Sequence, residues 1–160
     1  MKRTTFIIML AITAISGIFT SCSKEKKDEF TVTYKLTDHI DTIYVSECFT
    51  YDFTYTGADG NVVEVKDARA GWETEIKVKA PFTAKIEGKI KYNEAELPDE
   101  GIHLFGGEIA KISFYSYNIL YSSSSCIIYM WFSTKEEFLA YINKHPDRLN
   151  FSTTTEIKTE

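Results

Sequence analysis

Histidine and serine side chains supply many metal sites and nucleophiles, but in this chain they fall outside the known motifs. The three histidines are His39, His103 and His145, and none has a second His or Cys at a zinc-binding spacing such as HxH or HExxH. The four serines from Ser122 to Ser125 lack the glycines of a GxSxG nucleophile elbow. These spacings predict neither a metal site nor a serine-hydrolase centre.

Two glycine-containing segments also lack the partners that ligand binding requires. Gly106-Gly107 has no Lys-Ser/Thr pair of a phosphate-binding loop, and Asp59-Gly60-Asn61 lacks the other ligands of a calcium loop. We therefore predict no cofactor. A hydrolase of unknown substrate is the catalytic alternative, and it would need His39 or His103 within hydrogen-bond reach of a carboxylate.

Four acidic residues mark the best candidate for a partner-contact loop: Glu94, Glu96, Asp99 and Glu100. They lie in residues 92–107, the one long stretch without a strand or helix pattern, which we interpret as a surface loop. Long loops in compact domains are often functional, although a merely solvated loop is the alternative. As a contact, the loop would suit a basic partner.

The N-terminus has the three parts of an export signal. Lys2 and Arg3 are basic, residues 6–19 form an apolar run of 14 residues, and Thr20-Ser21 precede Cys22. Because a bilayer core needs about 20 apolar residues, the run is too short to span a membrane. We predict that residues 1–21 are a signal peptide.

The residues Phe19-Thr20-Ser21-Cys22 resemble the lipobox of bacterial lipoproteins, whose cysteine becomes diacylated and begins the mature chain. The charged run that follows, SKEKKDE, resembles the tethers of Bacteroidota lipoproteins. The resemblance implies a lipid anchor at Cys22, a lipidated tether over residues 22–29 and an envelope location at the outer membrane, on its periplasmic or surface face. Two acyl chains satisfy the requirement for stable attachment to the lipid bilayer.

Composition and charge fit one ordered domain over residues 30–160. The 160-residue chain is 44% hydrophobic and 26% charged, with three Pro and eight Gly. Removal of Lys2 and Arg3 with the signal peptide leaves 16 basic and 23 acidic residues, a formal charge of −7. Such a surface makes nucleic acid a poor partner.

Cys48 and Cys126 remain once Cys22 is acylated, and in an oxidising compartment they are a candidate disulfide. A bridge requires Cα atoms about 5.5 Å apart. The predicted strands place Cys48 on the face of Thr50, whereas Cys126 shares the face of Ile128. The pattern leaves both the bridge and two free thiols open.

Most of the remaining chain alternates apolar and polar residues with period two, which predicts half-buried strands. The alternating segments are residues 30–36, 42–55, 62–65, 72–78, 82–90, 109–117 and 126–132. Residues 57–61 supply a hairpin turn, and we expect a second, polar turn at Ser122 to Ser125. The Thr-rich residues 151–159 would pair as an edge strand or fray.

One short helix is expected near the C-terminus. Ser133-Thr134-Lys135-Glu136 has the form of a capping box with Ser133 as the N-cap. Phe138, Leu139 and Ile142 then recur at helical spacing until residues 144–146 end the run. The predicted fold class is mainly β, an antiparallel, immunoglobulin-like β-sandwich with one short C-terminal helix.

The run FTYDFTYTGADGNVVEV from Phe49, together with Trp72 and Ala80-Pro81-Phe82, resembles small immunoglobulin-like domains of bacterial envelope proteins, including the MmpS-like group. This resemblance implies an accessory role beside a membrane transporter. Separately, Asp41-Thr42-Ile43 resembles the acceptor pattern of Bacteroidota O-glycosylation, with Thr42 as the acceptor.

Taken as a whole, the sequence predicts a membrane-anchored lipoprotein that acts as a binding or scaffold module and not as an enzyme. Its partner would be an envelope protein or a glycan. Two alternatives remain open, an immunity or inhibitor lipoprotein that neutralises a basic partner and a small envelope hydrolase.

Overall fold

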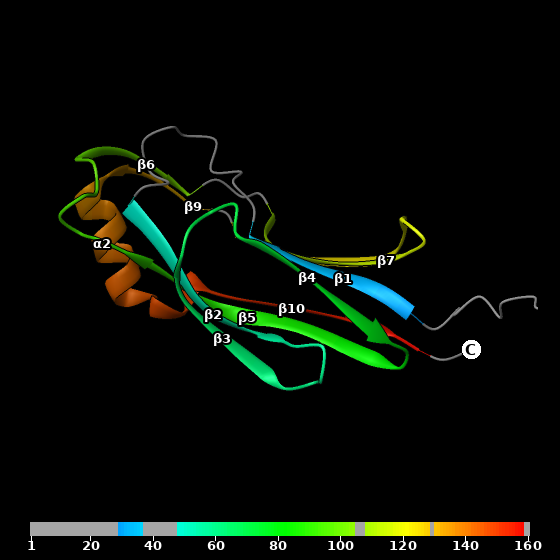
Figure 1. Ribbon diagram of the computed structural model, residues 1–160. Coiled ribbons are helices and arrows are strands. Elements are labelled where there is room, and N and C mark those ends of the chain that lie inside the picture. The colour runs from blue at the N-terminus through cyan, green and yellow to red at the C-terminus, as the bar shows by residue number, and fades with distance from the viewer. Residues whose placement is uncertain (1–28, 37–47, 105–107, 129, 159–160) are drawn as a thin grey trace, which may run out of the picture.

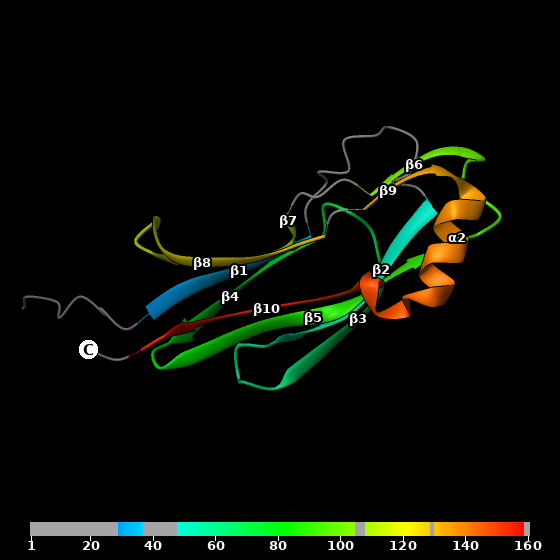
Figure 2. The same cartoon turned by 180° about the vertical axis from the view of Figure 1, so that it is seen from behind.

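The computed structural model describes residues 29–36, 48–104, 108–128 and 130–158 (Figure 1). Two four-stranded antiparallel sheets pack against each other, and a helix and a two-stranded sheet lie at one end (Figure 2). The predicted mainly β, antiparallel sandwich with one helix near the C-terminus is confirmed. The predicted signal peptide, Cys22, His39 and Thr42 lie outside the described residues.

The first sheet has the strand order β4-β1-β7-β8. Its strands are β1 (Glu29–Leu36), β4 (Glu73–Lys79), β7 (Glu108–Ser116) and β8 (Ile119–Ile127). The second sheet has the order β10-β5-β2-β3. Its strands are β2 (Phe49–Thr56), β3 (Val62–Ala68), β5 (Phe82–Tyr92) and β10 (Asn150–Ile157). Immunoglobulin constant domains instead group their strands as ABED and CFG, so the likeness lies in the two-layer architecture and not in the strand order.

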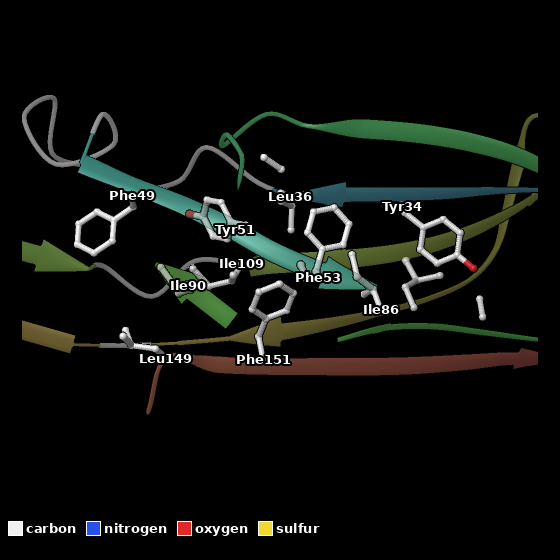
Figure 3. Close-up of a cluster of buried hydrophobic side chains, with 14 of the residues drawn as sticks. Tyr34, Leu36, Phe49, Tyr51, Phe53, Ile86, Ile90, Ile109, Leu149 and Phe151 are labelled. Carbon is white, nitrogen blue, oxygen red and sulfur yellow. The ribbon is translucent and has the colours of Figure 1, made fainter. Parts of the chain in front are cut away.

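The core lies between the two sheets, where alternate residues of each strand are buried. Figure 3 shows Tyr34 and Leu36 of β1 opposite Phe53 and Ile86 of the second sheet. The Tyr34 hydroxyl donates a hydrogen bond to the carbonyl of Thr56 at 2.7 Å and so links the two sheets. Burial raises the pKa of Tyr34 well above its ordinary value, so this hydroxyl stays protonated and can donate even in alkaline solution.

Gly88 of β5 lies opposite Phe53 on β2 and Phe151 on β10. A Cβ atom at this position would overlap the Cβ of Phe53 and the carbonyl oxygen of Asp52. The glycine therefore permits a close approach that no larger residue would allow without a shift of the neighbouring strand.

The hairpin that joins β7 and β8 turns at a different place from the one predicted. Ser122 to Ser125 do not form a turn but lie within β8. The chain reverses instead at Tyr117 and Asn118, whose φ angles are 50° and 63°. Two consecutive residues with positive φ are typical of the tight turns whose twist matches antiparallel strands.

The serines of β8 instead join the two sheets at one edge of the sandwich. The Ser122 hydroxyl lies 3.2 Å from that of Thr155, and the Ser124 hydroxyl lies 2.6 Å from that of Thr153. Because Thr153 is buried, its hydroxyl needs such a partner. The Thr-rich C-terminal segment thus forms an edge strand, β10, one of the two outcomes expected for it.

The helix α2 (Lys135–Lys144) begins one residue later than predicted. Thr134, and not Ser133, is the N-cap, and its hydroxyl accepts a hydrogen bond from the Glu137 backbone N–H at 3.2 Å. The Glu137 carboxylate accepts in turn from the Ser133 N–H at 2.9 Å. The capping box is therefore shifted by one residue from the predicted position, with Thr134 in the place of Ser133 and Glu137 in the place of Glu136. A 3-10 helix, η2 (Pro146–Leu149), follows α2.

The expected loop over residues 92–107 is only partly a loop. Residues 100–104 form strand β6 (Glu100–Leu104), which pairs with β9 (Met130–Thr134). The strand expected over residues 126–132 is divided in two. Residues 126–127 end β8, whereas residues 130–132 belong to β9, which pairs with β6 and not with the two four-stranded sheets.

Candidate functional site

The sandwich has two chemically different ends. At one end, which we call the tether end, β1 begins at Glu29 opposite Lys79 of β4, and the β7–β8 turn lies nearby. At the other, the helix end, lie α2, β6 and β9 (Figures 1 and 2). Because Glu29 is the last residue of the predicted tether, the lipid anchor would enter the domain at the tether end.

The predicted contact residues lie at the helix end. Strand β5 runs from the tether end to Tyr92, and the chain then turns through residues 93–99 before β6. We call Glu94, Glu96, Asp99 and Glu100 the acidic turn, although Glu100 is the first residue of β6. All four side chains are exposed, and none forms an ion pair with another described residue.

The backbone of the acidic turn is held to the body of the protein. The Asn93 N–H donates to the carbonyl of Cys48 at 3.0 Å, and the Cys48 thiol donates to the carbonyl of Glu96 at 2.8 Å. Leu97 is buried in the core. The four carboxylates therefore project from a fixed backbone, which lowers the conformational entropy lost on binding a partner.

The helix start brings further acidic residues to the same region. The Lys135 N–H donates to the carbonyl of Asp99 at 3.0 Å, so the first turn of α2 lies beside the acidic turn. That first turn carries Glu136 and Glu137. Sequence reasoning missed this pair because it treated Glu136 only as part of a helix cap and gave Glu137 no role.

Of the three predicted histidines, His39 lies outside the described residues, and the other two lie near the helix end. His103 lies on β6 opposite Trp131 of β9. His145 ends α2, where its N–H donates to the Tyr141 carbonyl at 2.9 Å and its ring centroid lies 4.7 Å from that of Tyr141. Within the part of the chain that the structure describes, no group of three or more His, Cys, Asp or Glu residues could hold a metal ion.

A cluster of three charged side chains lies on the outer face of the second sheet. Lys91 forms ion pairs with Asp67 at 2.7 Å and with Asp52 at 3.2 Å. A hydrogen bond from the Asp67 backbone N–H, assisted by Lys91, holds the pKa of Asp52 below its ordinary value. Asp67 has a φ of 52° beside a register shift between β2 and β3, so the cluster holds a β-bulge in place.

The described residues line two open grooves, one near each end of the sandwich. A groove of ≈ 500 Å³ at the tether end lies between the β2–β3 turn and residues 77–82. A groove of ≈ 370 Å³ lies between β5 and the end of α2, lined by Ile90, Tyr92, Ile142 and Leu149 together with polar residues. No histidine lines either groove.

The structure does not form the candidate disulfide. Cys48 is a buried cysteine before β2, Cys126 is a partly exposed cysteine on β8, and no disulfide joins them. The thiol hydrogen of Cys48 is used in the bond to the Glu96 carbonyl, and a disulfide sulfur has no such hydrogen.

We therefore expect two reactive thiols, Cys48 and Cys126, in the denatured domain. Thiol labelling of the folded protein should modify Cys126 first, and Cys48 should react only after denaturation because it is 6% exposed. Labelling of the denatured but unreduced protein decides the question. Fewer than two reactive thiols would show that a bridge forms.

Comparison with known proteins found no family model that matches the chain and no similar protein among curated sequences. Within the described ranges, no helix is long and apolar enough to cross a bilayer.

Proposed function

We propose that this protein is a cell-envelope lipoprotein whose β-sandwich is a binding or scaffold module, held at the outer membrane by an acylated Cys22. The lipobox-like residues and the charged tether support the anchor. The observation that carries the proposal is the position of the acidic turn, at the end of the sandwich opposite Glu29.

This position suits the presentation of a contact surface. Strand β5 has 11 residues and runs from the tether end to the acidic turn. At about 3.3 Å per residue, it places the turn roughly 35 Å from the tether end. That distance is several times the screening length of about 8 Å at physiological salt, so charges at the bilayer surface would not disturb the turn.

The charge of the region favours a partner with a basic surface. The acidic turn and the first turn of α2 together present six carboxylates on a fixed backbone. Complementary charge speeds association and selects against acidic competitors. The same observation favours the second candidate function, an immunity or inhibitor lipoprotein that neutralises a basic partner. In both functions the module binds and does not catalyse.

The proposal is tested by neutralising the acidic turn and capturing partners from cell envelopes. The test variant carries Glu94→Gln, Glu96→Gln, Asp99→Asn and Glu100→Gln. The matched control variant neutralises four exposed acids on the sandwich faces, namely Glu64, Glu75, Glu87 and Glu156. Both variants change the net charge equally, and each exposed substitution should alter stability by less than about 0.5 kcal/mol.

We expect the test variant to lose the captured partner and the control variant to retain it. Raising the salt concentration should weaken capture by the wild type, because exposed charges are screened. Identical partner profiles for wild type and test variant would exclude the acidic turn as the contact. Turnover of a substrate that is abolished by changing His39 or His103 would instead establish the hydrolase alternative.

A further inference from the structure

Large apolar side chains are exposed together at the tip of the β7–β8 hairpin. Four of them fall within residues 117–121, which we call the hairpin tip. Tyr117 is 62% exposed, Ile119 71%, Leu120 52% and Tyr121 55%. Contiguous exposed apolar side chains of this kind usually mark an interaction surface.

The surrounding sequence is also free of charge. Residues 112–134 contain no Asp, Glu, Lys, Arg or His, although 26% of the whole chain is charged. The hairpin tip therefore has no ionised side chain of its own that would have to be desolvated in an apolar environment. This property separates it from the β2–β3 turn at residues 57–61, which includes Asp59.

The hairpin tip lies at the tether end. Ser116 pairs with Ile119 across the turn, and Thr31 near the start of β1 pairs with Tyr115. The rings of Phe30 and Tyr121 are 5.3 Å apart, so the tip is in contact with the first residues of β1. In both Figure 1 and Figure 2 the hairpin curls away from the body of the sandwich at this end.

The length of the chain before β1 limits how far the tip can lie from a membrane. Cys22 precedes Glu29 by seven residues. A fully extended chain spans at most about 3.6 Å per residue, so an acylated Cys22 would hold Glu29 within about 25 Å of the bilayer surface. The bilayer is then the apolar phase closest to the hairpin tip.

We infer that the hairpin tip is a second membrane contact, which inserts into the interface of the same bilayer that holds Cys22. This inference rests on the proposed lipid anchor. Tyr117 and Tyr121 are suited to the headgroup level, because tyrosine places its ring in the apolar region and its hydroxyl in water. Ile119 and Leu120 would reach the acyl boundary beneath them. The contact would orient the sandwich with the acidic turn directed away from the membrane.

The test places a fluorescent side chain at the tip of the full-length lipoprotein. Ile119→Trp reports on the tip, and Ile127→Trp is the matched control because Ile127 is 66% exposed at the other end of the same strand. Each protein is reconstituted into phosphatidylethanolamine and phosphatidylglycerol vesicles, with or without brominated acyl chains. The wild type supplies the background from Trp72 and Trp131, and thermal midpoints confirm that both variants fold.

We expect brominated lipid to quench the tryptophan introduced at position 119 about twofold or more beyond that at position 127, because interfacial side chains reach the acyl boundary. Equal quenching at both positions would overturn the inference. So would an emission at position 119 that changes with protein concentration but not with bromination, because it would assign the tip to a second copy of the chain. Flotation with the vesicles tests the anchor separately. Protein that floats without preferential quenching contradicts only the membrane contact, whereas protein that does not float contradicts the anchor itself.

Discussion

Replacing Phe138 with alanine should lower the free energy of unfolding by about 3–5 kcal/mol, the usual loss when a buried aromatic ring is removed from a core. The Phe138 side chain is 0% exposed. Its ring lies 5.0 Å from Tyr92, 5.5 Å from Phe132 and 6.2 Å from Phe49, each in an edge-on arrangement. These contacts join α2 to both β5 and β9, so the loss should loosen the whole helix end.

Urea denaturation of Phe138→Ala beside the wild type measures this loss. Glu136→Ala is the matched control because it lies two residues away on the exposed face of the same helix. The control should change stability by less than about 0.5 kcal/mol. A loss of about 1 kcal/mol or less for Phe138→Ala would contradict the packing described here, because that is the size expected for an ordinary substitution.

The sandwich could be predicted from the sequence because most strands have one wet face and one buried face. Val32, Tyr34 and Leu36 alternate with polar residues along β1, and the structure buries all three. The turn at residues 57–61 could also be predicted, because glycine accepts positive φ without strain. Gly60 has a φ of 80° in the structure. Local pattern and tertiary structure agree in these segments.

The serines of β8 could not be placed correctly from local sequence. Four consecutive serines favour a turn, yet Ser122 and Ser124 find hydroxyl partners on β10, 33 and 29 residues later in the chain. The observed turn contains Tyr117 at positive φ. A bulky residue seldom adopts this angle, so the sequence does not predict a turn there. The placement of the serines thus depends on partners that are distant in the chain.

Strand β6 was missed for a similar reason. Residues 100–104 show no clear alternation, and they form a strand because β9 lies alongside. The exposure of Glu94 and Glu96 could be predicted from their charge. The position of the acidic turn beside α2 could not, because it depends on the hydrogen bonds from Cys48 and Lys135 to backbone carbonyls of the turn.

Replacing Cys22 with alanine should abolish stable membrane attachment. Each buried CH₂ of an acyl chain contributes about 0.8 kcal/mol, and a single chain alone binds only marginally, so the substitution would remove the whole of the proposed diacyl anchor. The hairpin tip would not compensate, because a few interfacial side chains cannot replace two acyl chains. The domain itself should fold as before, since Cys22 precedes β1 by seven residues.

Labelling of growing cells with radioactive palmitate tests the central claim most directly. Wild type, Cys22→Ala and the control Cys126→Ala are expressed in parallel, and the immunoprecipitated proteins are compared for label and for sedimentation with the membranes. We predict equal label in the wild type and the Cys126→Ala control. The Cys22→Ala variant should carry no label and be either exported without its anchor or retained as an uncleaved precursor. Palmitate incorporation by the Cys22→Ala variant equal to that of the wild type would contradict the lipoprotein assignment.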